Sequence, residues 1–254
     1  MRYLIHNKFK ALQGSIIFFI DNFLIEGKDF VIGKRNSIKL FELGNDVISI
    51  KSFKKPNIIN KIVYRYFRKS KARRSFEFAS KLMEMQIGTP HPVAFFENYD
   101  SIGLNESYYA CEHLENVFEF REIVQNTAFK NREEVLRQFT SFSFNMHQKG
   151  VEFLDHSPGN TLIKDNSDGT YSFYLVDLNR MKFHKAIDFQ TRMKNLSRLT
   201  PQKEMIKVMS NEYATLLGEK ESLVFETMWK MTESFQFRFH RKKRIKKKLK
   251  FWKK

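Results

Sequence analysis

Short runs of strand-forming residues, separated by turn residues, fill the segment between residues 30 and 53. The turn 33–36 separates the runs 30–32 and 37–41, and the turn 44–46 precedes the run 47–53. Apolar, β-branched and aromatic runs bounded by Gly, Asn and Asp are typical of antiparallel strands joined by tight turns. The sequence therefore predicts three antiparallel strands in this segment.

Helical periodicity appears in three later parts of the chain. Apolar residues recur at helical spacing within residues 71–85. A second helix is expected to begin at Asn131, whose side chain can cap it with Glu134 three residues on, and to continue to Gly150. Residues 185–236 are expected to form helices with polar interruptions.

Two further strand pairs are predicted between these helices. The first comprises residues 92–98 and 107–114, and the second comprises residues 160–164 and 171–176. Residues 165–169, Asp-Asn-Ser-Asp-Gly, favour a hairpin turn between the last two strands. Sheet and helix thus alternate, and we expect an α+β fold.

Composition limits where such a chain can act. Its 254 residues are 42% hydrophobic and carry a formal net charge of +17, which favours a folded, basic protein. The single Cys111 excludes an intrachain disulfide and any multi-cysteine zinc site, so a reducing, cytoplasmic location is expected. The apolar run 15–20 is too short to span a bilayer, so we expect any membrane association to be peripheral.

Polar residues at five positions follow the order in which a kinase uses them. Asp155 precedes Asn160 by five residues, the spacing of a kinase catalytic loop, and Asp177 ends a predicted strand. Lys51 lies on an upstream strand and Glu77 on an upstream helix. Phosphoryl transfer needs a cation on the phosphates, ligands for magnesium and a carboxylate facing the acceptor hydroxyl. The order of these residues predicts that chemistry.

Structural roles could also explain the same residues. Turn capping accounts for an Asp and an Asn in a loop, and Lys51 could face solvent like its neighbours Lys54 and Lys55. His147 and His156 flank the loop, and we expect them to pack against it or to hydrogen-bond it rather than to catalyse.

The chain resembles the bacterial lipopolysaccharide core kinases, which phosphorylate heptose or Kdo and belong to the protein-kinase-like superfamily. The resemblance runs from about residue 32 to residue 185 and is carried by segments 47–53, 70–77, 88–94, 153–163 and 175–181. It implies a two-lobed fold, with a small antiparallel sheet and helix in residues 1–114 and a mainly helical lobe in residues 115–236. A basic tail, residues 237–254, would follow.

The resemblance also assigns an ATP site. Lys51 would contact the α- and β-phosphates and Glu77 would hold that lysine in an ion pair. The turn that begins at Gly33 would cover the phosphates through its backbone N–H groups. Residues Cys111 to Leu114 would form the hinge that hydrogen-bonds adenine.

The same comparison assigns Asp155 as the catalytic base, and Asn160 and Asp177 as ligands of Mg²⁺. Phe153 stands where protein kinases have His, and Ser157 where they have Lys. These departures argue against a protein acceptor. The resemblance implies instead a sugar hydroxyl on a lipopolysaccharide core or related glycolipid. The Pro-Gly-Asn sequence at 158–160 is also similar to that of aminoglycoside and choline-type kinases, which leaves a soluble small-molecule acceptor as an alternative.

Two basic regions suggest an anionic partner. Residues 61–74 hold seven Lys or Arg interleaved with apolar residues, and residues 238–254 hold eleven with no acidic residue. As a helix, the second region suits the surface of an anionic membrane, where a glycolipid acceptor would lie. Alternatively, the second region could be a solvated tail or could contact nucleic acid nonspecifically. For the whole chain, the alternative to an active enzyme is a catalytically silent kinase fold that binds membranes or nucleic acid.

Overall fold

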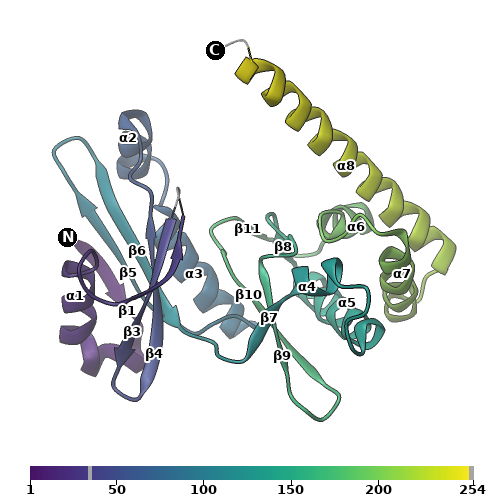
Figure 1. Ribbon diagram of the computed structural model, residues 1–254, viewed down its shortest axis with the longest axis horizontal. Coiled ribbons are helices and arrows are strands. Elements are labelled where there is room, and N and C mark those ends of the chain that lie inside the picture. The colour runs from purple at the N-terminus through teal and green to yellow at the C-terminus, as the bar shows by residue number, and fades with distance from the viewer. Residues whose placement is uncertain (34–35, 252–254) are drawn as a thin grey trace. The chain divides into compact units, whose positions relative to one another are not determined.

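The computed structural model describes residues 1–33 and 36–251, with side chains described as far as residue 247. The chain divides into two compact units (Figure 1). Unit 1 comprises Met1–Asn116 and Tyr174–Arg180, and unit 2 comprises Val117–Phe173 and Met181–Lys254. The short segment 174–180 therefore joins unit 1 although unit 2 flanks it in sequence.

Unit 1 is built on a six-stranded antiparallel sheet with the order β1-β5-β6-β4-β3-β2. Its strands are β1 (Arg2–Ile5), β2 (Lys28–Ile32), β3 (Asn36–Leu43), β4 (Asp46–Phe53), β5 (Pro92–Tyr99) and β6 (Leu104–Glu112). The strands expected in 30–53 and the pair expected at 92–98 and 107–114 are confirmed. Strand β1, which pairs with β5, was not expected from the sequence.

Helices cover both faces of this sheet (Figure 1). The 3-10 helix η1 (Asn7–Leu12) and α1 (Gln13–Asp21) pack on the face that carries Ile48 and Ile50, where Ile16 and Ile20 enter the core. Helix α3 (Lys71–Glu84), the expected helix of residues 71–85, packs on the other face, where Phe76 lies 5.5 Å from Phe95. The apolar run 15–20 is thus a core helix.

Unit 2 is mainly helical. Its helices are α4 (Phe120–Gln125), α5 (Arg132–Gln148), α6 (Phe189–Leu196), α7 (Lys203–Leu217) and α8 (Glu221–Phe251). Strands β7 (Val117–Glu119), β9 (Thr161–Asp165) and β10 (Tyr171–Leu175) form one small sheet, and β8 (Val151–Phe153) pairs with β11 (Met181–Phe183). The predicted hairpin joins β9 to β10. No helix in the part of the chain that the structure describes is long and apolar enough to cross a membrane.

Helix α5 begins after Asn131 and ends in a tight turn at Gly150. Asn131 precedes the helix but adopts a left-handed conformation, φ 55°, and makes no side-chain cap bond, so the predicted cap is wrong. Instead, the negative charges of Glu133 and Glu134 in the first turn stabilise the helix by interacting with the positive N-terminal end of its dipole. At the other end Gly150 has φ 74°, and a Cβ there would lie 2.1 Å from the His184 carbonyl oxygen. Only glycine fits this turn.

Candidate active site

Strand β4 places Lys51 on the face of the sheet opposite Ile48 and Ile50. Because side chains alternate along a strand, the two buried isoleucines turn Lys51 toward the side that α3 covers. Its Nζ donates a 2.7 Å hydrogen bond to Oδ1 of Asp177 and lies 5.3 Å from the ring centre of Phe53. The side chain is only 17% exposed, so Lys51 is not a solvent-facing strand residue.

Asp177 lies just after β10 in a constrained backbone. Its φ is 58°, a left-handed conformation that is uncommon for residues other than glycine and clusters at functional sites. Asn179 Nδ2 donates to Oδ1 of Asp177 at 2.9 Å, the same oxygen that Lys51 contacts. No described residue hydrogen-bonds the second carboxylate oxygen, Oδ2, which leaves that atom available to a metal ion.

Three hydrogen bonds hold the Asp177 segment in unit 1. Leu175 donates its N–H to the Gly88 carbonyl at 2.9 Å and accepts from the Thr89 hydroxyl at 2.9 Å. Arg74 Nη1 on α3 donates to the carbonyl of Asn179 at 2.7 Å. Segment 88–94 pointed in sequence only to the family resemblance, and the role of Gly88 and Thr89 as an anchor for the Asp177 segment was not predicted.

Glu77 does not form the expected ion pair with Lys51. Its carboxylate accepts from Lys69 Nζ at 2.8 and 2.9 Å and from Arg73 Nε at 2.9 Å. These hydrogen bonds lower the pKa of Glu77, against the opposing effect of burial. Arg73 is four residues earlier on the same helix, where side chains meet directly, so a local partner satisfies Glu77. The predicted Lys51–Glu77 ion pair is therefore wrong for this structure, and Lys51 pairs with Asp177 instead.

The predicted phosphate cover and hinge also lie in unit 1. Gly33 donates its N–H to the Asn36 carbonyl at 3.1 Å, whereas Lys34 and Arg35 of the same turn lie outside the described residues. Cys111 on β6 pairs with Ser49 on β4, one residue before the end of that pairing, and burial raises the pKa of its thiol to about 12. The thiol is thus inert, and the hinge can offer only backbone groups near Leu114.

Backbone pairing narrows the choice of hinge donor. The N–H groups of Glu112 and His113 donate to the carbonyls of His91 and Val47, each at 2.9 Å. These two N–H groups are therefore engaged, and the next one along the chain belongs to Leu114.

In unit 2, an arginine holds the predicted base. Arg198 Nη1 donates to Oδ1 of Asp155 at 3.0 Å and to the Leu154 carbonyl at 2.8 Å. The Asp155 side chain is 22% exposed, so the carboxylate is fixed in place yet accessible. Arg198 follows α6 in a region whose periodicity predicted only helices, and nothing in the sequence indicated that it would contact Asp155.

The backbone of Asp155 fixes the orientation of the Asn160 side chain. Its Nδ2 donates to the backbone carbonyl of Asp155 at 2.8 Å. The amide group then turns its other atom, the oxygen Oδ1, away from that bond, and an amide oxygen is a suitable ligand for Mg²⁺.

The donor set fits magnesium rather than a softer metal. Within residues 1–33 and 36–251 there is no group of three or more His, Cys, Asp or Glu side chains that could hold a metal ion. Mg²⁺ commonly binds through one or two carboxylates together with substrate phosphates and water. In unit 1, the second carboxylate oxygen of Asp177 is a donor of this kind, and in unit 2 the amide oxygen of Asn160 is another.

A buried network connects the helices of unit 2 to the strand before Asp155. His147 Nδ1 lies 2.9 Å from the Tyr213 hydroxyl, and its Nε2 lies 3.1 Å from Oδ1 of Asn195. Asn195 Nδ2 donates to the Phe153 carbonyl at 2.7 Å. Because the amide NH₂ of Asn195 donates to Phe153, the atom that faces His147 is the amide oxygen, which can only accept a hydrogen bond. The ring proton of His147 is therefore on Nε2. The expected hydrogen bond from His147 to the loop itself is not found among these contacts, and His147 reaches the strand before the loop only through Asn195.

His156 follows the base directly and is fully buried. Its ring packs 5.6 Å from the rings of Phe139 and Phe153. Burial lowers its pKa to about 3, so the ring is neutral at physiological pH. The expected packing role is confirmed.

An antiparallel-sheet unit that carries an anchored lysine, and a mainly helical unit that carries an Asp-x4-Asn loop, define the protein-kinase-like class. A solved structure with this fold, described as WaaP in complex with acyl carrier protein, matches with a TM-score of 0.62 and 17% sequence identity. The match covers 92% of this chain and 99% of the WaaP chain.

Residues 54–219 match the family model described as the lipopolysaccharide kinase (Kdo/WaaP) family. The chain belongs to this family, and the family resemblance found in the sequence is confirmed. It is therefore a kinase-type phosphotransferase. None of the curated proteins searched matches the chain significantly.

Proposed function

We propose that this protein is an ATP- and Mg²⁺-dependent kinase that phosphorylates a sugar hydroxyl of a lipopolysaccharide core or related glycolipid. The observation that carries the proposal is the geometry of loop 155–160. Arg198 fixes the Asp155 carboxylate, while Asn160 bonds the Asp155 backbone and keeps its amide oxygen for a metal ion. A loop needed only for folding has no requirement for an accessible carboxylate beside an oriented amide oxygen.

In this reaction Asp155 accepts the proton of the sugar hydroxyl as its oxygen bonds to the γ-phosphorus of ATP. The bond from that phosphorus to the β–γ bridging oxygen breaks, and ADP leaves. Lys51 would neutralise phosphate charge. Asp177 and Asn160 would hold Mg²⁺, which would supply further neutralisation of the phosphates. Lys51 must then exchange its contact with Asp177 for a contact shared with the nucleotide.

Gly33, Cys111 and Leu114 complete the proposed nucleotide site. The Leu114 N–H is the proposed adenine donor, since the N–H groups of the two preceding residues are engaged in the sheet. The Gly33 turn would cover the phosphates. Glu77 is left out of this proposed site, because its carboxylate pairs with Lys69 and Arg73.

The acceptor and its location are proposed from charge. A surface with net charge +17 suits an anionic glycolipid better than a cationic aminoglycoside or amino alcohol. Helix α8 is buried at Val224, Met228 and Thr232, and from Phe237 through Lys247 every residue is exposed. We propose that this exposed basic half associates peripherally with the cytoplasmic face of the inner membrane.

The test compares cell-envelope glycolipids with and without the gene by mass spectrometry. Loss of the gene should remove one phosphoryl group from a core glycolipid, and the parent gene, but not Asp155→Asn, should restore it. An unchanged glycolipid profile would contradict the proposed acceptor. Copurification would show separately whether this chain, like the WaaP structure, associates with an acyl carrier protein.

The membrane role of α8 has its own test. Truncation after Gln236 removes eleven Lys or Arg, each of which contributes about 1 kcal/mol at an anionic surface. We expect the truncated protein to stay folded, because the buried residues of α8 remain, but to bind anionic vesicles less tightly in cosedimentation over a salt series. Equal binding at low salt would contradict this role.

A further inference from the structure

Helix α2 (Ile58–Tyr66) in unit 1 turns its apolar side outward. Residues 58, 59, 62 and 66 recur at the spacing that places side chains on one face of a helix. Their exposed fractions are large, as is that of the residue that follows the helix: Ile58 64%, Ile59 73%, Ile62 40%, Tyr66 66% and Phe67 82%. We refer to these five residues as the α2 face.

Polar contacts hold the opposite side of α2 against the β5–β6 hairpin. Lys61 donates to the carboxylate of Asp100 and to Oδ1 of Asn105, the latter at 3.2 Å. Arg65 Nη1 donates to the carbonyls of Ser101 at 2.9 Å and Asp100 at 3.3 Å. An amphipathic helix on a folded unit normally buries its apolar side, so this helix is fixed in the reverse orientation.

Such an apolar surface needs an apolar partner, because large exposed patches of this kind mark interaction sites. The surrounding charge identifies the kind of partner. From residue 51 to residue 75 the chain has no Asp or Glu, and it has ten Lys or Arg: Lys51, Lys54, Lys55, Lys61, Arg65, Arg68, Lys69, Lys71, Arg73 and Arg74. Carboxylates from other segments of unit 1 pair with Lys51, Lys55, Lys61, Lys69 and Arg73, and the segment as a whole keeps an excess of positive charge. The α2 face lies within this basic segment. Together they are complementary to a lipid bilayer, which presents anionic headgroups at its surface and apolar chains beneath them.

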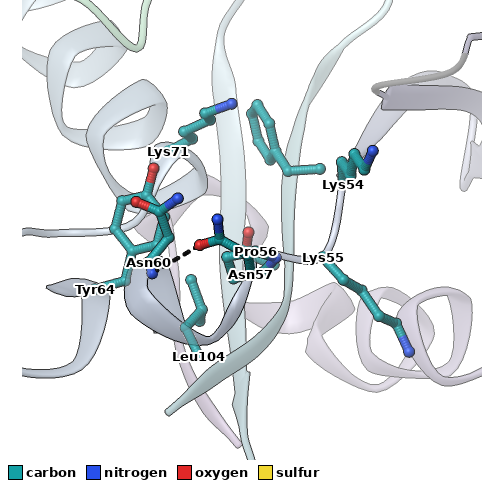
Figure 2. Close-up of a pocket in the computed structure, with 10 residues that line it drawn as sticks. Lys54, Lys55, Pro56, Asn57, Asn60, Tyr64, Lys71 and Leu104 are labelled. Atoms are coloured by element: carbon teal, nitrogen blue, oxygen red, sulfur yellow. Dashed lines mark hydrogen bonds between the residues drawn. The ribbon is translucent and has the colours of Figure 1, made fainter. Parts of the chain in front are cut away.

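A pocket at the start of α2 supplies a place for the anionic group. Its volume is about 400 Å³, and its lining includes Lys54, Lys71, Asn57, Asn60 and Tyr64 but no carboxylate. Figure 2 shows Asn57 and Asn60 at the first turn of the helix, with Lys54 on the chain leading into it and Lys71 from the start of α3. Among the described side chains Lys54 has no carboxylate partner, so its charge is not neutralised within the protein.

We propose that α2 is a membrane-docking helix, whose α2 face enters the apolar layer of an anionic bilayer while the headgroup of an anionic phospholipid, with its uncompensated phosphate charge, occupies the pocket beside Lys54 and Lys71. This surface lies in unit 1 and is separate from the α8 tail of unit 2. This membrane binding is independent of the proposed kinase activity, because binding to vesicles is measured in the absence of ATP and of phosphoryl transfer.

The first test uses full-length protein and phosphatidylcholine vesicles with and without phosphatidylglycerol. The double variant Ile59→Ser, Phe67→Ser should bind the vesicles about tenfold more weakly, because two large apolar side chains that would transfer from water into the bilayer are removed. The matched control Leu24→Ser, Ile25→Ser replaces residues that are 87% and 80% exposed elsewhere in unit 1, and should bind like the parent. The difference should persist at high salt, where binding by the α8 tail is screened.

A second variant separates the pocket from the α2 face. Lys54→Gln should weaken binding to vesicles that contain phosphatidylglycerol and leave binding to neutral vesicles unchanged. Lys28→Gln, an exposed lysine on β2, is the control and should change neither.

A third measurement remains valid even if a serine variant folds poorly. Tryptophan at position 67, Phe67→Trp, should be quenched by phospholipid with brominated acyl chains, whereas Leu24→Trp should not. The native Trp229 and Trp252 are common to both variants. Unaltered binding of the double variant, together with no quenching at position 67, would overturn the proposal. So would loss of self-association in the double variant with vesicle binding intact, which would identify the α2 face as a contact between two copies of this chain.

Discussion

Lys51 and Asp177 are 126 residues apart in the chain, yet Nζ of the lysine lies 2.7 Å from Oδ1 of the aspartate. The lysine comes from the central strand β4, and the aspartate comes from a segment that returns to unit 1 after the chain has entered unit 2. The proposed phosphate-binding cation and the proposed metal-binding carboxylate are thus held together by unit 1 alone.

Replacing Lys51 with methionine should lower the rate of phosphoryl transfer by about 100-fold or more, because a preorganised charge on the phosphates is lost. Initial rates at saturating ATP measure this effect. Lys28→Met, an exposed strand lysine in the same unit, should keep the parent rate. If a change at Lys54 or Lys55 had the large effect instead, the assignment of Lys51 would be wrong.

Asp177→Asn should weaken nucleotide binding chiefly when magnesium is present, because one carboxylate ligand is lost while the Asn179 contact can persist. Calorimetric titration of ATP with and without Mg²⁺ separates the two conditions. Asp29→Asn, whose carboxylate lies 3.9 Å from Lys39 on the surface, is the control. An unchanged magnesium dependence in Asp177→Asn would place the metal elsewhere.

Arg198 is a positioning residue, since it acts through Asp155. Arg198→Met should lower kcat by about tenfold or more, as the base loses its fixed orientation, and leave the KM for ATP near the parent value. Arg198→Lys should recover part of the rate, because an ammonium group can replace one of the two hydrogen bonds. A parallel rise in the KM for ATP would indicate a general structural defect instead.

Acid should destabilise unit 2 through His147. Burial lowers its pKa from 6.5 to about 4, so the folded protein keeps it neutral while the unfolded chain takes up a proton. Stability is therefore present above pH 6.5 and declines as the pH falls toward about 4, by roughly 3 kcal/mol for this residue.

Urea denaturation at a series of pH values, followed by tryptophan fluorescence, measures this dependence. His147→Gln should have a flatter pH dependence than the parent, whereas the exposed His240→Gln should not. Equal slopes for all three proteins would show that His147 is not the group responsible.

Local patterns predicted most of the fold. Turn residues bounded the strands of residues 30–53, and helical spacing located α3. The cap at Asn131 failed because sequence gives a residue's capping potential but not its φ angle, which the preceding turn determines. Helix α2 shows a similar limit, because periodicity reveals an apolar face without showing which side contacts the sheet.

Side-chain partners across long sequence separations were harder to predict. The family resemblance placed Asp155, Asn160 and Asp177 in the right elements, but the partner of Glu77 was wrong, since Arg73 one helical turn away satisfies it. Arg198 carried no signal, because an arginine 43 residues from Asp155 looks like any other surface cation until the helices pack.

The most direct test of the account is transfer of labelled γ-phosphate from ATP to purified core glycolipid by the parent protein and by Asp155→Asn. The variant removes the base but keeps a side chain of the same size, and Asp165→Asn at the end of β9 is the matched control. We expect the parent and Asp165→Asn to label the glycolipid, and Asp155→Asn to lose about 100-fold or more of the rate while binding ATP normally. Full labelling by a folded Asp155→Asn protein would contradict the account.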